Sequence, residues 1–251
     1  MPLSEDQKTR YSRQLCMPEI GPAGQEKLLK SSVLIIGAGG LGSPVALYLA
    51  AAGVGTIGLA DCDAVDLSNL QRQILHGTDT LGVPKVDSAA ARLRALNPDV
   101  HVQPYPVLVN DNNIASLIAP YDFVVECTDS FDAKYLINDA CVRTGKPFCH
   151  GAVIRFYGQV MTVLPGTSAC YRCAFRQPPD PEKAPDARKL GVLGAVPGVI
   201  GCLQALEAIK YLTGAGDLLT NQLLTFDALS MDFETVELTK SPDCPVCGGC
   251  L

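Results

Sequence analysis

One stretch decides the fold of this 251-residue chain: SVLIIGAGGLGSPVALYLAAAGVGTIGLAD, residues 32–61. An apolar run at 32–37 ends in glycine, a helix-like segment follows at 41–53, and a second apolar run occupies 56–61. Short apolar runs on either side of a helical segment are typical of a βαβ unit. We therefore expect parallel strands covered by helices.

The turn inside this unit carries the pattern G-x-G-x-x-G, from Gly37 to Gly42. Glycines let the backbone turn sharply and approach a phosphate, and the following helix offers free N–H groups. Asp61 follows Gly42 by 19 residues, at a strand end where a carboxylate can hold ribose hydroxyls. These features predict a nucleotide site. The pattern alone leaves NAD, ATP and a ligand-free tight turn open.

The same alternation of strand-like and helix-like segments continues to residue 151, and the pattern of the sequence then changes. Further segments up to that point read as strands at 100–105, 122–127 and 147–151 and as helices at 84–97 and 132–144, with a short helix between the first two strands. Beyond it, strands are expected at 157–164, 223–228 and 232–239 and a helix at 198–212, with a flexible loop at 177–190 that is rich in proline and charge. The pattern predicts an α/β fold with a Rossmann-like doubly wound sheet. We expect the sheet to be mostly parallel, with antiparallel strands added in the C-terminal half.

The composition limits the classes of function. The net charge is −6 at pH 7, which argues against binding to nucleic acid or to an anionic membrane surface. No segment approaches the ~20 apolar residues of a membrane span. The charged first residues lack the apolar core of a signal peptide. We expect a cytoplasmic protein.

Charged side chains gather where the strands are expected to end. Arg72 and Lys85 follow Asp61 along the chain, and Asp129 comes directly after the strand at 122–127. The carboxyl ends of strands in a doubly wound sheet face the ligand crevice, so we expect these side chains on one rim. A triphosphate needs cations and an acid for Mg²⁺, whereas a dinucleotide needs little beyond the glycine loop and one acid. The set favours ATP, although singly Arg72 and Lys85 are more often solvated charges and Asp129 a helix N-cap.

Two C-x-x-C pairs, Cys170/Cys173 and Cys244/Cys247, are separated by 70 residues. Two such pairs can form a closed, structural Cys₄ zinc site. The gap is longer than in a compact zinc ribbon, and two disulfides or redox-active dithiols are the alternatives. A reducing compartment favours metal over disulfides. Cys250 adds a third cysteine at the same spacing, and we expect it to fray with the terminus. The three histidines are scattered and predict no metal site.

Several motifs occur in an order that resembles the ThiF/MoeB family, bacterial relatives of ubiquitin-activating enzymes. They are RYSRQ (10–14), GAGGLG (37–42), ADCD (60–63), LSNLQRQ (67–73), PK (84–85), CTD (127–129), CYRC (170–173) and CPVCGG (244–249). The resemblance covers nearly the whole chain, and the wording is closest to ThiF. It implies an enzyme that uses Mg-ATP to adenylate the C-terminal Gly-Gly carboxylate of a ubiquitin-like sulfur carrier protein, with release of pyrophosphate. The product would serve thiamine or molybdopterin biosynthesis.

The resemblance also implies roles for residues and segments. Asp61 would hold the ribose, Gly39 and Gly40 would admit the phosphates, Asn69, Arg72 and Lys85 would contact phosphate, Asp129 would coordinate Mg²⁺, and Arg13 would reach the phosphates from the other subunit. A homodimer with shared active sites follows, and zinc would be structural. The implied organisation is one adenylation domain over 1–251: N-terminal helices at 1–30, a nucleotide-binding half at 31–151 and a carrier-binding half at 152–251.

One position departs from the family pattern. Many relatives carry a reactive cysteine before the segment GVLG; aligned on residues 191–194, this chain has Ala187 there. No cysteine lies between Cys173 and Cys202. We therefore expect the enzyme to make the acyl-adenylate and to leave sulfur transfer to a separate donor. A non-catalytic scaffold, or an NAD-dependent oxidoreductase, are the alternatives. Retention of the charged residues Arg13, Arg72, Lys85 and Asp129 argues against a scaffold. An oxidoreductase would leave Arg72, Lys85 and Asp129 unexplained.

Overall fold

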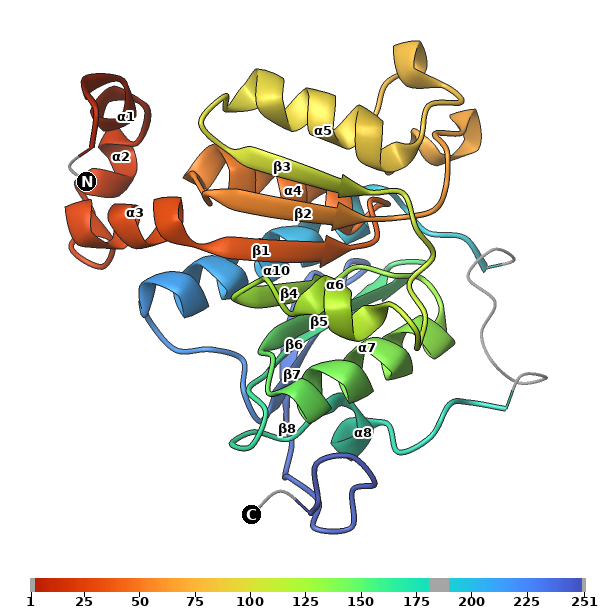
Figure 1. Ribbon diagram of the computed structural model, residues 1–251. Coiled ribbons are helices and arrows are strands. Elements are labelled where there is room, and N and C mark those ends of the chain that lie inside the picture. The colour runs from red at the N-terminus through yellow and green to blue at the C-terminus, as the bar shows by residue number, and fades with distance from the viewer. Residues whose placement is uncertain (1–2, 181–189, 250–251) are drawn as a thin grey trace.

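The computed structural model describes residues 3–180 and 190–249. Within these residues the strands form one eight-stranded sheet in the order β3-β2-β1-β4-β5-β6-β7-β8 (Figure 1). Their bounds are β1 (Ser32–Ile36), β2 (Thr56–Ala60), β3 (His101–Tyr105), β4 (Phe123–Glu126), β5 (Phe148–Ile154), β6 (Tyr157–Val163), β7 (Gln222–Asp227) and β8 (Asp232–Glu237). The strands β3, β2, β1, β4 and β5 pair in parallel. The strands β6, β7 and β8 are added to them antiparallel. The predicted fold class is confirmed.

Helices cover both faces of the sheet (Figure 1). They are α1 (Glu5–Arg10), α2 (Ser12–Leu15), α3 (Gly21–Lys30), α4 (Gly42–Ala52), α5 (Lys85–Leu96), α6 (Ile114–Ile118), α7 (Phe131–Thr144), α8 (Tyr171–Ala174) and α10 (Ala195–Thr213), with short 3₁₀ turns at Leu67–Asn69 and Thr78–Thr80. Successive side chains of a strand point to opposite faces. Val33 and Ile35 accordingly join a core with α4, α5 and α10, while Leu34 and Ile36 join a second core with α6 and α7.

Two predicted elements differ in extent from those in the structure. The helix predicted at 198–212 begins earlier, at Ala195, because Pro197 falls in the first helical turn, where a missing N–H breaks no intrahelical bond. The strand predicted at 147–151 continues to Ile154 because β6 pairs with it along its whole length. The predicted flexible loop at 177–190 falls mostly outside the described residues.

Helix α10 departs from the expectation that no segment approaches the length of a membrane span. It has 19 residues and is long and apolar enough to cross a membrane by length and composition alone. A core helix passes the same test, and α10 packs against α4 and against strands β5 and β6. Its apolar surface therefore has partners inside the fold.

Candidate functional site

A cleft of about 920 Å³ opens at the carboxyl ends of the parallel strands. It is lined by the glycine loop, by the turns after β2 and β4, and by side chains from α7, α8 and β6. The lining includes six residues singled out from the sequence: Gly39, Gly40, Asp61, Arg72, Lys85 and Asp129. The fold thus brings together groups that lie far apart in the chain, as the topology of a doubly wound sheet predicts.

The glycine loop has two glycines that the fold itself requires. Gly37 has a φ of +101°, and a Cβ there would lie 2.6 Å from the carbonyl oxygen of Cys127. A Cβ on Gly42 would collide with the carbonyl of Gly37. At Gly39, by contrast, a Cβ would meet nothing nearer than Gln73 Nε2 at 3.5 Å. A side chain at Gly39 would fit the protein but would occupy the cleft, so this glycine keeps the backbone open to a ligand.

The backbone N–H and the backbone carbonyl of Ala38 are both held by side chains of other elements. Asp61 Oδ2 accepts a 2.7 Å hydrogen bond from the Ala38 N–H, and His76 Nε2 lies 2.9 Å from the Ala38 carbonyl oxygen. The other ring nitrogen of His76 lies 3.0 Å from Ser88 Oγ. Burial lowers the pKa of His76, so the neutral ring donates to the carbonyl and accepts from the serine. No local sequence pattern indicates this role, because the two partners of His76 come from different elements.

Arg72 is oriented by Asn69, which does not itself line the cleft. Asn69 Oδ1 accepts hydrogen bonds from Arg72 Nη2 at 2.8 Å and from Gln73 Nε2 at 3.2 Å. Asn69 ends a 3₁₀ turn that Asp66 caps through the N–H of Ser68. The observed contact of Asn69 is thus with the arginine, and its contact with phosphate stays a prediction.

Gln73 is a cleft residue that sequence reasoning missed. It is 4% exposed, and its Oε1 is a sealed side-chain oxygen with no hydrogen-bond partner among the described residues. Buried polar atoms are nearly always paired, so this acceptor indicates a donor that is supplied by a ligand or by water. Together with the open backbone at Gly39, it fits the binding of a nucleotide.

Lys85 lies at the first residue of α5, and its side chain is only 6% exposed. Its Nζ donates a 2.9 Å hydrogen bond to Asp63 Oδ2. An ammonium group has three donors, so one acceptor does not exhaust its capacity. Arg72 and Lys85 thus place positive charge in the cleft lining.

A buried ion pair supports the turn that presents Asp129. Glu126 is fully buried at the end of β4, and Lys134 Nζ donates to both of its oxygens at 3.1 and 3.0 Å and to the Thr128 carbonyl at 2.8 Å. Thr128 in turn donates its N–H and its hydroxyl to Glu126 at 2.7 and 2.6 Å. Thr128, the residue before Asp129, is therefore fixed by hydrogen bonds at its amide, its hydroxyl and its carbonyl.

The protonation states in this network follow from burial and pairing. Burial acts to raise the pKa of Glu126, but the Lys134 ammonium and a hydrogen bond from His150 outweigh it and lower the pKa to about 2. Burial lowers the pKa of His150, which is therefore neutral. Its Nδ1–H donates to Glu126 Oε2 at 2.7 Å, and its Nε2 accepts from Gln159 Nε2 at 3.2 Å. The carboxylate is ionised and every partner is complementary to it.

Arg13 lies far from the cleft of its own chain. It sits on α2 and is exposed, and its neighbour Gln14 donates to the carbonyl of Ala52, at the C-terminal end of α4. The cleft lies at the other end of α4, which spans about 16 Å at 1.5 Å per residue. Figure 1 shows α2 beyond the N-terminal ends of β1 and β2, whereas the cleft lies at the carboxyl ends of the strands. Arg13 therefore does not line the cleft of its own chain, and its role in the cleft of another subunit stays a prediction.

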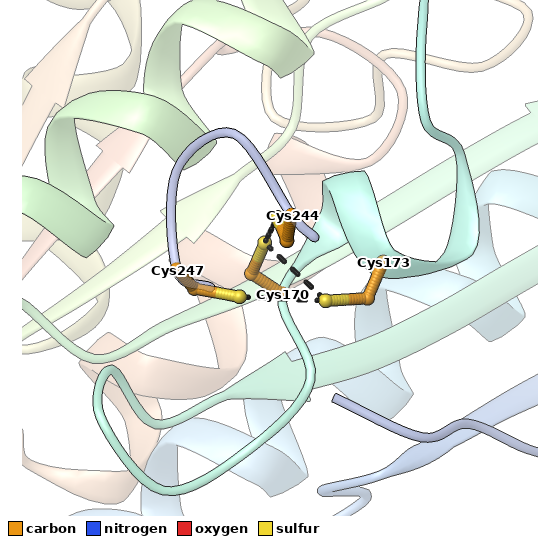
Figure 2. Close-up of side chains that lie close together, drawn as sticks. All are labelled: Cys170, Cys173, Cys244 and Cys247. Carbon is orange, nitrogen blue, oxygen red and sulfur yellow. Dashed lines mark hydrogen bonds between the residues drawn. The ribbon is translucent and has the colours of Figure 1, made fainter. Parts of the chain in front are cut away.

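The four cysteines of the two C-x-x-C pairs come together at one point (Figure 2). The Sγ–Sγ distances are 3.6 Å for Cys170–Cys244, 3.4 Å for Cys173–Cys247 and 3.9 Å for Cys170–Cys173. These sulfurs are too far apart for disulfides, whose S–S bond is about 2.05 Å. Four thiolates about 2.3 Å from a tetrahedral Zn²⁺ would lie about 3.8 Å apart, so the cluster fits the metal. Cys250 and Ala187 lie outside the described residues.

Comparison with known proteins gives four consistent findings. The sequence profile of the ThiF family matches residues 11–246. The chain is 49% identical over 246 residues to the SAMP-activating enzyme E1 of Haloferax volcanii, covering 98% of this chain and 91% of the relative. It is 45% identical over 250 residues to the sulfur carrier protein adenylyltransferase of Thermus thermophilus, covering 98% and 92%. The chain also matches 54% of the length of the adenylyltransferase and sulfurtransferase MOCS3 of Sus scrofa, at 49% identity over 98% of this chain.

Solved structures of Escherichia coli MccB are similar in fold. The structure with MccA-N7isoASN has a TM-score of 0.86 at 26% identity, covering 98% of this chain and 76% of that one. The structure with ATP has a TM-score of 0.83 at 26% identity, covering 96% and 75%.

Proposed function

Because the chain belongs to the ThiF family, we propose that it is an ATP-dependent adenylyltransferase acting on the C-terminal Gly-Gly carboxylate of a ubiquitin-like sulfur carrier protein. The observation that carries the proposal is one cleft in which an open glycine loop, two cations and an exposed carboxylate meet. A hydride-transfer enzyme would have no use for Arg72 and Lys85 beside Asp129.

The reaction joins two anions, and this sets what the protein must do. A carboxylate oxygen of the carrier attacks the α-phosphorus of ATP. The new bond is an acyl–phosphate bond, and the bond from the α-phosphorus to the bridging oxygen breaks, so pyrophosphate leaves with that electron pair. A carboxylate is a weak nucleophile toward an anionic phosphate. Catalysis therefore rests on orienting it and on neutralising charge on the phosphoryl oxygens.

The cleft residues divide these tasks. Asp61 would hold the ribose, because its oxygens retain lone pairs beyond the backbone bonds they accept. Gly39 and Gly40 would admit the phosphates to the N-terminus of α4, which has no side-chain cap. Arg72 and Lys85 would face the phosphates, and Asn69, just outside the cleft lining, would hold Arg72 toward them. Asp129 would hold Mg²⁺, which neutralises phosphate charge when bound.

The remaining parts of the proposal concern metal, partner and assembly. Zn²⁺ in the cluster of Cys170, Cys173, Cys244 and Cys247 would tie the C-terminal segment to the rest of the fold. Arg13 would act in the cleft of a partner subunit, which makes the homodimer the active unit. We also propose that sulfur comes from a separate donor, because Ala187 supplies no thiol. Residues 31–151 would bind nucleotide, and residues 152–251 would bind the carrier.

The test is intact-protein mass spectrometry of Gly-Gly carriers, ThiS-like and MoaD-like, incubated with this protein and Mg-ATP. We expect one carrier to gain the mass of one AMP. The absence of an adduct on every carrier, with ATP binding verified, would contradict the proposal.

A further inference from the structure

The turn that carries the first cysteine pair is also a wall of the cleft. Tyr171 lies between Cys170 and Cys173 in the chain, and both Tyr171 and Phe175 line the cleft. Helix α8, which contains Tyr171, has only four residues, too few to be stable alone. Its position must come from what it is attached to.

Helix α7 provides one attachment. The Tyr171 N–H donates to Asn138 Oδ1 at 2.9 Å. Arg172 makes a two-pronged pair with Asp139, with Nε–Oδ1 at 2.7 Å and Nη2–Oδ2 at 2.8 Å, and its guanidinium lies 4.7 Å from the ring centre of Tyr135. Paired arginine–carboxylate bonds fix orientation as well as distance. The cysteine cluster is the second attachment, on either side of Tyr171.

Tyr171 belongs to an aromatic cluster whose rings are mostly buried, with Tyr171 3% and Tyr135 4% exposed. Tyr171 packs against Tyr135 with ring centres 5.0 Å apart and against Phe175 at 4.9 Å. Tyr135 Oη donates to the carbonyl of Phe175 at 3.0 Å. This cluster adjoins the proposed phosphate side, because Tyr135 lies on α7 and Asp129 comes two residues before that helix begins.

The hydroxyl of Tyr171 is the polar group in this cluster that the fold leaves unused. Among the described residues this hydroxyl has no hydrogen-bond partner. Its oxygen nevertheless keeps some contact with solvent, unlike Gln73 Oε1, which is both unpaired and fully buried. A hydroxyl that is unpaired but not sealed, on a residue that lines the cleft, is open to a ligand there. The Tyr135 hydroxyl, by contrast, is already committed to Phe175.

We propose that the turn 170–175, held by α7 and by the cysteine cluster, is a recognition wall for the carrier tail, and that Tyr171 is its specificity-determining residue. The inference rests on the proposed function and deepens it. An extended Gly-Gly tail has no side chains, so it offers only backbone N–H and C=O groups and its carboxylate. The Tyr171 hydroxyl, at the tip of a buried ring, bonds that backbone, and the partly exposed ring of Phe175 packs against it. The wall then sets affinity for the carrier but not for ATP, because Gly39, Asp61 and Arg72 belong to other elements.

The experiment uses the full chain, its bound metal measured by atomic emission. The probes are the carrier that accepts AMP in the mass assay and a non-hydrolysable ATP analogue, each titrated by calorimetry. Tyr171→Phe removes only the hydroxyl. Arg172→Gln releases the turn from Asp139 and leaves the four thiols intact. Arg143→Gln is the matched control, because Arg143 also pairs with Asp139, at 3.6 Å, but is mostly exposed and does not belong to the turn.

We expect Tyr171→Phe and Arg172→Gln to keep their metal and their affinity for the ATP analogue, and to bind the carrier about tenfold more weakly, or ~1.4 kcal/mol. Arg143→Gln should bind both probes as the wild type does. Wild-type carrier affinity in Tyr171→Phe, or equal losses for carrier and nucleotide, would overturn the recognition wall while the proposed function stands. A wild-type chain that adenylates no Gly-Gly carrier would overturn both.

Discussion

Replacing Lys134 by methionine tests the support of the turn that presents Asp129. In the wild type Lys134 neutralises Glu126, and both side chains are almost completely buried, at 6% and 1% exposure. Removing one partner of a buried ion pair typically costs about 3–5 kcal/mol, because the remaining charge is left without compensation. We expect Lys134→Met to lower the free energy of unfolding at pH 7 by that amount. The double variant Lys134→Met/Glu126→Gln should recover much of the loss, since it removes both charges.

The pH dependence supplies an independent magnitude. The pKa of Glu126 falls from 4.5 to about 2 on folding, and a shift of this size corresponds to about 3 kcal/mol. Because the folded-state pKa is depressed, this stabilisation is complete above about pH 4.5 and is lost as the pH falls toward 2. In Lys134→Met, burial raises the pKa of Glu126 instead, so acidification protonates it and relieves the penalty. The difference in stability between wild type and variant should therefore shrink on acidification.

Urea unfolding at pH 7 and at pH 4, followed by circular dichroism, measures both effects. The control is Lys30→Met, which removes an exposed i,i+4 pair with Glu26 at 3.5 Å and should change stability by less than ~0.5 kcal/mol. A Lys134→Met variant that loses under ~1 kcal/mol at pH 7, or whose loss is the same at both pH values, would refute the argument from burial.

Three other predictions concern the site. Asp129→Ala should abolish AMP transfer with an unchanged thermal midpoint, because it removes an exposed carboxylate; retained turnover would reject Asp129 as the Mg²⁺ ligand. Subunits with Arg13→Ala, mixed with Asp129→Ala subunits, should regain part of the activity that each lacks alone, since one cleft of each mixed dimer is intact; verified mixed dimers without activity would exclude sharing. Cys247→Ser should lower the bound zinc measured by atomic emission and weaken stability, because a structural metal site contributes folding energy directly; full zinc content would show that Cys247 is not a ligand.

The sequence predicts the elements well where the signal is local. The apolar runs around Gly37 and the turn after residue 53 define β1, α4 and β2 to within a residue or two, because each is set by its own periodicity and its own glycines. The placement of Asp61 and Asp129 at one cleft also follows, since the topology of a parallel sheet brings strand ends together.

The supporting residues could not be predicted in the same way. Lys134 reads as a surface lysine in a polar helix, and it is buried only because β4 and β5 bring Glu126 and Gly151 to it. Gln73 lies in a motif that the resemblance singled out, but its unpaired oxygen depends on how the turn packs over the glycine loop. Such pairings join elements distant in sequence, so no local pattern records them.

His150 lies between the two parts of the cleft wall to which the substrates are assigned, the turn that presents Asp129 and the turn that carries Tyr171. Its Nδ1–H bonds Glu126, which fixes Thr128 beside Asp129, and its ring lies 4.6 Å from that of Tyr171 in the proposed carrier wall. Attack of a carboxylate on a phosphate depends on holding both in register, and misplacement by about 1 Å can cost a hundredfold in rate. A neutral, fully buried histidine suits this position, because it bonds the carboxylate through one nitrogen and adds no charge between two anionic substrates. The turn that presents Asp129 and the proposed carrier wall therefore rest on the same buried support, so the positions of the α-phosphate and the carrier carboxylate would be set together.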